Sequence, residues 1–331
     1  MTPQVSALPS AAVPPGTAER LARTARGLAR AGATPASAAS RAGAPEALRG
    51  ELRTALALPD RRRGFRVVTG LLAGFADPGP TPPHWRGPQS AEADAIDLAL
   101  ALATSALGRL YGWAHQQDGR LVHNILPIPG HEDEQVGASS ATLLTRHTED
   151  AFHPLRPHLL VLAVMRNPEG VGSSVSSVRR AALSAEDRAR LSRPLVTITP
   201  DDSYAPPEGA ASWREVEGPR TPVLWAADDG LCLRYDPAYS VLPDDPGFLG
   251  SYDALEKALQ DCEEEVPLGP GDVILIDNDV AAHGRRPFRA RYDGTDRWLK
   301  RAIIGLDRPR PAAEAAEPGY GQRTVEPEAA R

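Results

Sequence analysis

The stretch Gly271-Asp-Val-Ile-Leu-Ile-Asp-Asn-Asp-Val-Ala-Ala-His283 predicts both a core strand and a functional residue. Its central run, Val273–Asp277, is short, apolar and rich in β-branched residues. Gly-Asp precedes the run and Asp-Asn ends it, so the pattern is that of a buried strand followed by a loop. We expect His283 to lie in this loop, at the mouth of a β barrel.

A second informative segment, His147-Thr-Glu149, lies far earlier in the chain. Residues two apart on a strand point to the same side, so His147 and Glu149 can bind one metal ion. Two imidazoles and one carboxylate can occupy one face of an iron(II) ion and leave the opposite face open for an oxoacid and O2. His147, Glu149 and His283 are therefore the candidate metal ligands and catalytic residues.

The spacing of a histidine two residues before an acid is weak evidence by itself, since it also occurs at His131 and Asp133. That second pair lies in the polar run Gly-His-Glu-Asp-Glu, which is typical of a solvated loop. His147 is soon followed by the apolar run 158–165 and is the better candidate. A surface pair without a metal is the alternative for His147 and Glu149.

Two arginines follow the last histidine of the candidate set. Arg297 comes fourteen residues after His283, and Arg301 lies four residues further on, so a strand would point both to the same side. An arginine at such a place can hold the far carboxylate of a dicarboxylate co-substrate. A solvated basic strand edge is the alternative. With the metal ligands, the arginines indicate a non-haem iron oxygenase that uses 2-oxoglutarate.

Composition is that of an ordinary soluble enzyme. The chain has 331 residues, 41% of them hydrophobic and 24% charged, which suits one β-rich domain with insertions. A net charge of -6 and an aromatic content of 5% give no reason to expect nucleic-acid binding. Neither a membrane span nor a secretory signal is predicted. Cys232 and Cys262 match no metal or disulfide pattern, so we expect reduced thiols and a cytoplasmic protein.

Helical patterns dominate before residue 110 and short strands after it. Helices are predicted at 17–31, 45–57, 91–110, 184–191 and 251–264. Strands are predicted at 66–72, 121–127, 158–165, 195–198, 222–225, 231–235, 273–277 and 298–306. The expected fold is mainly β with flanking helices, a jelly-roll core braced by N-terminal helices.

One oxygenase domain is expected over residues 16–308, with a helical part at 16–110 and the jelly-roll core at 111–308. Residues 1–15 are rich in proline, alanine and serine and are predicted to be disordered. Residues 309–331 are rich in proline, glutamate and alanine and are predicted to be a flexible tail.

The motifs together resemble the clavaminate synthase-like oxygenases, a group within the taurine dioxygenase-type superfamily. This group includes clavaminate synthase, the L-arginine and L-asparagine β-hydroxylases and lysine hydroxylases. The resemblance spans roughly residues 60–308. It rests on His147-Thr-Glu149-x-Ala-x-His153, Gly271-Asp272…Asp277-Asn278…His283-Gly-Arg285-x-Pro-Phe288 and Asp293-Gly-x-Asp-Arg297-Trp-Leu-x-Arg301.

This resemblance implies a double-stranded β-helix that binds iron(II), 2-oxoglutarate and O2. It implies that the two histidines and Glu149 bind the iron and that Arg297 holds the co-substrate. Relatives place a hydroxyl group against 2-oxoglutarate near the positions of Ser173 and Ser174, although the spacing here is about two residues short. Arg301 matches the arginine that grips the α-carboxylate of the substrate.

The resemblance also implies residues that contact the substrate. Family members use a glutamine about thirty residues before the His-x-Glu motif, and Gln116 or Gln117 fits that place. Asp236 falls where the family carries an acid that meets the end of the substrate side chain, which favours a cationic or amide group. The second acid that arginine hydroxylases tend to show is absent after Asp236, where Pro237 and Ala238 follow. A turn cap is the alternative role for Asp236.

These inferences predict hydroxylation of a free polar L-amino acid, lysine-, arginine- or asparagine-like or a derivative, in specialised metabolism such as antibiotic biosynthesis. We expect the β-carbon to be the target, because Glu149 can contact the substrate amino group through its free oxygen. The expected partner is a small molecule, with no nucleic acid and no membrane. Alternatives are a desaturase or cyclase of the same class, a zinc-binding cupin-type protein without oxygenase activity, and a catalytically inactive binding protein.

Overall fold

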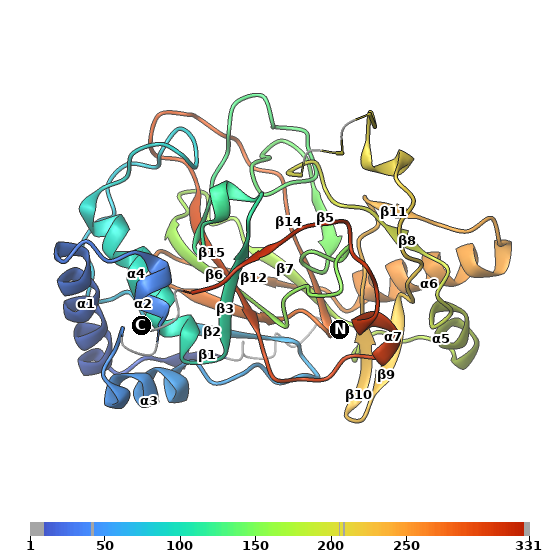
Figure 1. The fold of residues 1–331 in the computed structure, drawn as a ribbon, viewed down its shortest axis with the longest axis horizontal. Coiled ribbons are helices and arrows are strands. Elements are labelled where there is room, and N and C mark those ends of the chain that lie inside the picture. The colour runs from blue at the N-terminus through green and yellow to red at the C-terminus, as the bar shows by residue number, and fades with distance from the viewer. Residues whose placement is uncertain (1–9, 41–42, 205, 208, 328–331) are drawn as a thin grey trace, which may run out of the picture.

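The structure, a computed structural model, describes residues 10–40, 43–204, 206–207 and 209–327. It is a mixed α/β protein in which the described strands form several sheets (Figure 1). The larger sheet has eight strands in the order β1-β2-β13-β6-β15-β3-β16, with β4 also paired to β15. Their bounds are β1 Ser10–Ala12, β2 Phe65–Thr69, β3 Arg109–Trp113, β4 His123–Ile125, β6 Leu159–Arg166, β13 Val273–Asp277, β15 Trp298–Gly305 and β16 Thr324–Val325.

A smaller sheet contains four of the described strands in the order β12-β7-β14-β5. These strands are β5 Leu144–His147, β7 Ser173–Ser177, β12 Glu264–Val266 and β14 Ala281–Arg285. Two further pairs join β8 Thr197–Ile198 to β11 Ser240–Val241 and β9 Leu224–Ala227 to β10 Gly230–Leu233. The helices are α1 Pro15–Arg30, α2 Pro35–Ala39, α3 Glu46–Ala55, α4 Ala91–Ser105, α5 Ala185–Leu191, α6 Pro246–Asp261 and α7 Ala312–Ala315.

The larger sheet is buried on both faces, as its central strand β6 shows. Successive residues of a strand point to opposite faces. Leu159, Val161 and Ala163 pack into the core that the N-terminal helices form. Leu160 and Leu162 pack into a second core, which also contains residues of the smaller sheet. Because both faces are buried, β6 is a nearly continuous apolar run and could be predicted from sequence.

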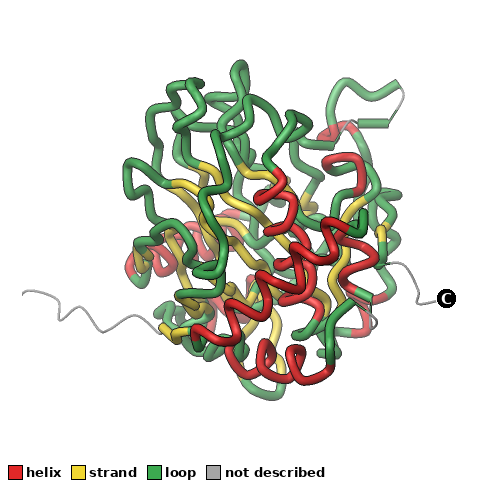
Figure 2. Tube along the Cα trace, turned by 90° about the vertical axis from the view of Figure 1, so that its left-hand side faces the viewer, coloured by secondary structure: helices red, strands yellow, loops and turns green. Residues whose placement is uncertain are grey.

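Helix α4 explains how one face of the larger sheet is covered. Its residues 95–104 are all buried, so every side of the helix beyond its first turn is covered by the protein. Its start is fixed by Ser90, whose hydroxyl accepts a hydrogen bond from Ala93 N at 3.0 Å. Contacts with α1, α2 and β15 surround it. Figure 2 looks onto this side, with the helices in front of the strands. The opposite face of the sheet is left for the smaller sheet and the site.

The predicted helices and apolar strands are confirmed with shifted ends, and two expectations are wrong. The predicted helix 91–110 ends at Ser105, because residues 109–113 form β3 against β15. His283 lies in a strand, not in the expected loop, since β14 pairs with β7 on one side and β5 on the other. The polar strands β5 and β7 were not predicted. No helix in the described part of the chain is long and apolar enough to cross a membrane.

Both chain ends contain secondary structure where they are described. β1 pairs with β2 inside the segment predicted to be disordered, while residues 1–9 lie outside the described residues. The segment predicted to be a flexible tail contains α7 and β16, and residues 328–331 of it are not described. Within it, Glu314 pairs with Arg156 and Glu317 pairs with Arg234 at 2.8 Å. The domain bounds stay predictions.

Replacing Glu314 by glutamine is expected to destabilise the fold. Arg156 has no exposed side-chain surface and Glu314 has 5%, so the change leaves a buried guanidinium without its nearest carboxylate. Breaking one partner of a buried pair costs about 3 kcal/mol. Urea unfolding measures the loss. The control is Glu326→Gln, whose exposed pair with Arg109 contributes about 0–1 kcal/mol. Equal midpoints for the two variants would contradict a buried, paired segment.

Candidate active site

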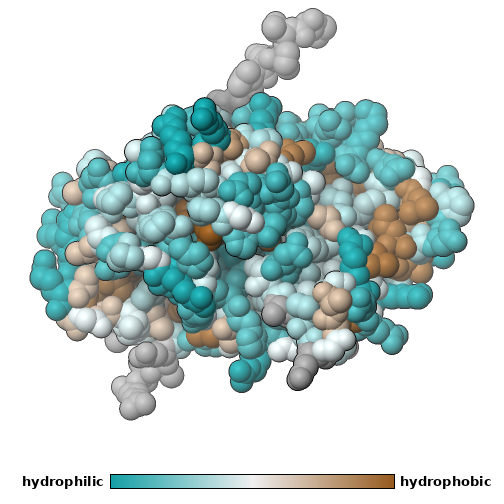
Figure 3. Space-filling model, turned by 90° about the horizontal axis from the view of Figure 1, so that it is seen from above, coloured by the Kyte–Doolittle hydropathy of each residue, from teal (hydrophilic) through white to brown (hydrophobic). Residues whose placement is uncertain are grey.

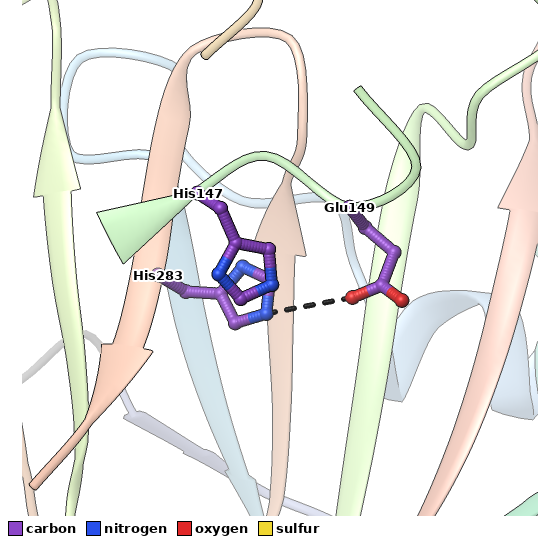
Figure 4. A group of neighbouring side chains, drawn as sticks. All are labelled: His147, Glu149 and His283. Atoms are coloured by element: carbon purple, nitrogen blue, oxygen red, sulfur yellow. Dashed lines mark ion pairs between the residues drawn. The ribbon is translucent and has the colours of Figure 1, made fainter. Parts of the chain in front are cut away.

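The candidate metal ligands meet where β5 and β14 pair. His147 on β5 and His283 on β14 stand directly opposite one another in the register, and Glu149 follows two residues after His147. One ligand atom from each of the three lies within 4.8 Å of the others. Figure 4 shows the two rings side by side, with His283 Nε2 3.5 Å from Glu149 Oε2. Within the described ranges, this is the one compact group of three such side chains.

The protonation of this group suits a divalent cation. Burial, and then the nearby His283, lowers the pKa of His147, which favours the neutral ring that metals bind. Burial opposes ionisation of Glu149, but Arg301 and the histidines outweigh it and hold its pKa below the ordinary value. His147 Nδ1 donates to Thr145 O at 2.8 Å in this neutral form, which leaves Nε2 as the ligand atom. His283 Nδ1 is buried without a hydrogen-bond partner. The donor set therefore fits iron(II).

The backbone of Glu149 is held by Asn278, a residue of the turn that follows β13. Asn278 Oδ1 accepts from Glu149 N at 2.7 Å, and Asn278 Nδ2 donates to Glu149 O at 2.9 Å. The next residue, Asp150, has a φ of 52° and accepts from Trp113 Nε1 at 2.8 Å. The two hydrogen bonds to Asn278 fix the backbone of Glu149. The hydrogen bond from Trp113 holds the side chain of Asp150, a residue type that tolerates the left-handed region. The contacts of Asn278 give Asp277-Asn278, one of the quoted sequence motifs, a structural role.

Arg301 joins the metal group to the residues predicted to contact a substrate. Its guanidinium donates to Glu149 through Nη1 and to Gln116 Oε1 through Nη2, the latter at 2.6 Å. Gln117 instead bonds the backbone of Asn124, so Gln116 is the glutamine that faces Arg301. Sequence reasoning missed His123, whose Nδ1 accepts from Arg301 at 2.6 Å.

The contact with His123 keeps Arg301 in place without adding charge. Burial and the Arg301 guanidinium lower the pKa of His123 to about 3, so the ring is neutral and accepts a hydrogen bond. Burial opposes the charge of Arg301, but Glu149 more than compensates and raises its pKa. Nothing in the sequence around His123 resembles a motif, which is why it could not be found there.

A cavity of about 80 Å³ adjoins the candidate ligands. It is lined from both sheets, by Ser173 of β7 and His283 of β14 on one side and Leu299 of β15 on the other. Ser174 is not among its lining residues. Arg297 also lines it, is 7% exposed and makes no hydrogen bond or ion pair to a described residue. Burial, and then Arg285, lowers the pKa of Arg297 to about 9. The inner cavity thus offers a cation for an anionic ligand.

A wider outer cavity of about 360 Å³ shares Ile125, Asp201 and Arg301 with the inner one. Gln116 and Gln117 line it. The face of the molecule drawn in Figure 3 is mostly hydrophilic, with its clearest hydrophobic patch at the right-hand end. Because Arg301 lines both cavities, the outer cavity adjoins the inner one, which the candidate ligands line.

Asp236 behaves as the turn cap that the sequence left open. Its Oδ1 accepts from Ala238 N at 3.1 Å and from Tyr239 N at 3.3 Å, and it lines neither cavity. Burial raises its pKa to about 6. Asp201 lines both cavities and was missed, because it stands in an unremarkable polar loop. Burial also raises the pKa of Asp201, and its side chain accepts from Ser203 N at 2.8 Å.

The other His-x-acid pair is not part of the candidate ligand group, although His131 lines the outer cavity. His131 lies in a turn, with its Nδ1 2.7 Å from Glu134 and 46% of its side chain exposed. This is the solvated loop that the surrounding polar run predicts. Asp133 is not part of a compact ligand group.

The fold and this site define a metal-dependent oxygenase, and comparison with known proteins agrees. Residues 86–303 match the family described as "Taurine catabolism dioxygenase TauD, TfdA family". The chain belongs to this family of iron(II)- and 2-oxoglutarate-dependent oxygenases.

Several relatives are similar over most of their length. Enduracididine beta-hydroxylase of Streptomyces hygroscopicus is 38% identical over 74% of this chain and 78% of its own. L-ornithine/L-arginine 3-hydroxylase of Catenulispora acidiphila is 36% identical over 72% and 75%. The crystal structure of non-heme iron oxygenase OrfP with Fe, succinate and (3S)-hydroxy-L-Arg has a TM-score of 0.78 and 39% identity, covering 90% of this chain and 95% of that one.

Replacing His147, Glu149 or His283 by alanine is expected to lower the affinity for divalent metal by at least about 100-fold. The site has three protein ligands, and losing even an outer partner of a ligand costs roughly 10- to 100-fold. Calorimetric titration with Mn²⁺ under anaerobic conditions measures the affinity. His131→Ala is the matched control and is expected to bind as the unchanged protein does. If His131→Ala lost the metal instead, the ligand assignment would be wrong.

Proposed function

We propose that this oxygenase hydroxylates a free L-amino acid with a polar or cationic side chain at its β-carbon. The observation that carries the proposal is the buried contact of Arg301 with Glu149 and Gln116, beside the candidate metal ligands. This arrangement offers a cation, a carboxylate and an amide to the charged groups that every free amino acid carries.

The fold we propose is a double-stranded β-helix. Two observations support it: the larger and smaller sheets share one hydrophobic core, and the inner cavity is lined by residues of both. A ligand set on paired strands at the end of such a core suits the jelly-roll arrangement expected from sequence.

His147, Glu149 and His283 would hold iron, and Arg297 would hold the far carboxylate of 2-oxoglutarate with Ser173 nearby. When bound, iron and 2-oxoglutarate supply the oxidising power that inserts an oxygen atom from O2. The chain contributes position and exclusion of water. Burial of Arg297 strengthens its attraction for a carboxylate, because few water molecules compete.

The amino acid would bind with its α-carboxylate on Arg301. Its ammonium group would then face Gln116 and Glu149 Oε1, the oxygen that points toward Arg301 while Oε2 faces His283. Because Glu149 is also a candidate metal ligand, such a contact brings the first carbons of the substrate close to the metal. This favours attack at the β-carbon over attack at a distant side-chain position.

A cationic side chain is favoured by two acids, Asp201 and Asp236. The relatives bear names that specify enduracididine, ornithine and arginine as substrates, and OrfP has been solved with L-Arg. Asp201 lines both cavities. Asp236 caps a turn through Oδ1 and lines neither cavity, so its proposed contact with the substrate rests on the resemblance to the family. A cationic group that reached either carboxylate would be attracted to it.

The function is tested with a panel of free L-amino acids, incubated with the protein, iron, ascorbate and 2-oxoglutarate. Arginine, ornithine and their relatives are expected to gain the mass of one oxygen, and the product's NMR spectrum places it on the β-carbon. The Glu149→Ala protein serves as the inactive control. A loss of two hydrogens would indicate a desaturase or cyclase, and no change in any amino acid would contradict the proposal.

Asp201→Asn and Asp236→Asn are expected to raise KM more for arginine than for the neutral citrulline. A charge-assisted contact contributes about 1.5–3 kcal/mol, and asparagine keeps the shape without the charge. Arg301→Ala is expected to impair both substrates alike. Asp133→Asn is the matched control, because Asp133 is exposed and lines neither cavity. An equal rise of KM for both substrates in the Asp201 and Asp236 variants would assign these acids a purely structural role.

A further inference from the structure

Arg285 is the third arginine of the inner cavity, beside Arg297 and Arg301, and the sequence patterns predict no role for it. It ends β14, two residues after His283, and pairs across the sheet with Ser173. Arg285, Arg297 and Ser173 all line the inner cavity. Arg285 is 4% exposed and Arg297 is 7% exposed, so both guanidinium groups are withdrawn from bulk solvent.

The two guanidinium groups lie close to each other and have no carboxylate partner in the described ranges. They stand 4.9 Å and 5.9 Å from the centre of the same ring, that of Phe288. Arg285 donates only to Ser139 O, Ser139 Oγ and Thr142 O. The Nε atoms of both arginines are buried without a hydrogen-bond partner.

Two other buried arginines, unlike Arg285 and Arg297, have carboxylate partners. Arg156 pairs with Glu314, and Arg234 pairs with Glu317. Burying one cation without a counter-charge is costly, and burying two side by side adds their mutual repulsion. Carbonyl oxygens satisfy hydrogen bonds but carry no full negative charge. Arg285 and Arg297 line a cavity without a carboxylate partner among the described residues, so an anionic ligand in this cavity would balance their charge.

We propose that Arg285 is the second cation of the co-substrate site and that it acts with Arg297 on the far carboxylate of 2-oxoglutarate. The inference rests on the proposed function, in which Arg297 holds that carboxylate. The carbonyls of Ser139 and Thr142 fix the Arg285 guanidinium in place. Its charge then favours a 2-oxoacid with a second carboxylate over one that ends in a methyl group.

A purely structural role for Arg285 makes a different prediction. If Arg285 only connects residues 139–142 to β14 by hydrogen bonds, replacing it would lower the affinity of the cavity for every 2-oxoacid alike. The charge role predicts a loss that depends on the far carboxylate. The two roles are therefore separated by comparing 2-oxoglutarate with 2-oxovalerate, which has the same chain length and no far carboxylate.

The test measures binding without turnover, by calorimetric titration of each 2-oxoacid into protein loaded with Mn²⁺ in place of iron. Arg285→Gln is expected to raise the Kd for 2-oxoglutarate by roughly 10- to 100-fold, as for a lost charge-assisted contact. The Kd for 2-oxovalerate should change by less than about threefold. Arg285→Lys keeps the charge and is expected to keep most of the preference for 2-oxoglutarate.

Two further variants serve as a control and as a comparison for Arg285→Gln. Arg286→Gln is the matched control, since Arg286 is exposed, pairs with Glu265 and does not line the cavity. It is expected to bind both 2-oxoacids as the unchanged protein does. Arg297→Gln is expected to lose at least as much affinity for 2-oxoglutarate as Arg285→Gln.

Unchanged binding of 2-oxoglutarate by Arg285→Gln would overturn the proposal, and so would equal losses for both 2-oxoacids. If Arg285→Gln shows no cooperative thermal unfolding, Arg285→Lys decides: a retained preference for 2-oxoglutarate supports the charge role, and a lost one contradicts it. Failure of the unchanged protein to bind 2-oxoglutarate would instead overturn the proposed function, and this inference with it.

Discussion

The register between β5 and β14 is the constraint on which the rest of the site depends. It sets His147 opposite His283, so two residues far apart in sequence become neighbours through backbone pairing. A slip of one residue would turn one ring to the other face of the sheet and separate the pair. Glu149 depends on the same register, because Asn278, shortly before β14, holds its backbone on both sides. The site is therefore a product of sheet geometry more than of any local loop.

Two classes of buried charge serve different purposes in this molecule. Arg156 and Arg234 form ion pairs with carboxylates of the C-terminal segment, so their positive charges are balanced within the chain. Arg297 has no such partner and Arg285 meets only neutral oxygens. The first class ties segments together, where a neutral pair is an advantage. The second lines the inner cavity, where an incomplete charge balance is the physical basis for attracting an anion.

Sequence reasoning succeeded where a strand is apolar on both faces. β6 and β13 belong to the middle of the larger sheet and keep a nearly continuous hydrophobic run. It failed for β7, whose sequence Ser-Ser-Val-Ser-Ser has a single apolar residue although the whole strand is buried; Ser173 of this strand lines the inner cavity. Strands that border a site depart from the usual pattern for the sake of that site.

The same contrast applies to the functional residues. His147, Glu149 and His283 could be selected because metal ligands need particular residue types at particular spacings. Gln116 could be narrowed down only to a choice between two glutamines. His123 and Asp201 carry no such spacing, and their importance comes from neighbours that only the folded chain supplies.

The C-terminal segment has a consequence for how the chain folds. Glu314 lies 158 residues after Arg156 in sequence, and β16 pairs with β3 across more than half of the chain. Contacts of such long range slow folding, because much of the chain must be ordered before they form. During synthesis, Arg156 leaves the ribosome long before Glu314 exists. The nascent chain must therefore keep this guanidinium hydrated, and the last part of the core closes only after most of the protein has been made.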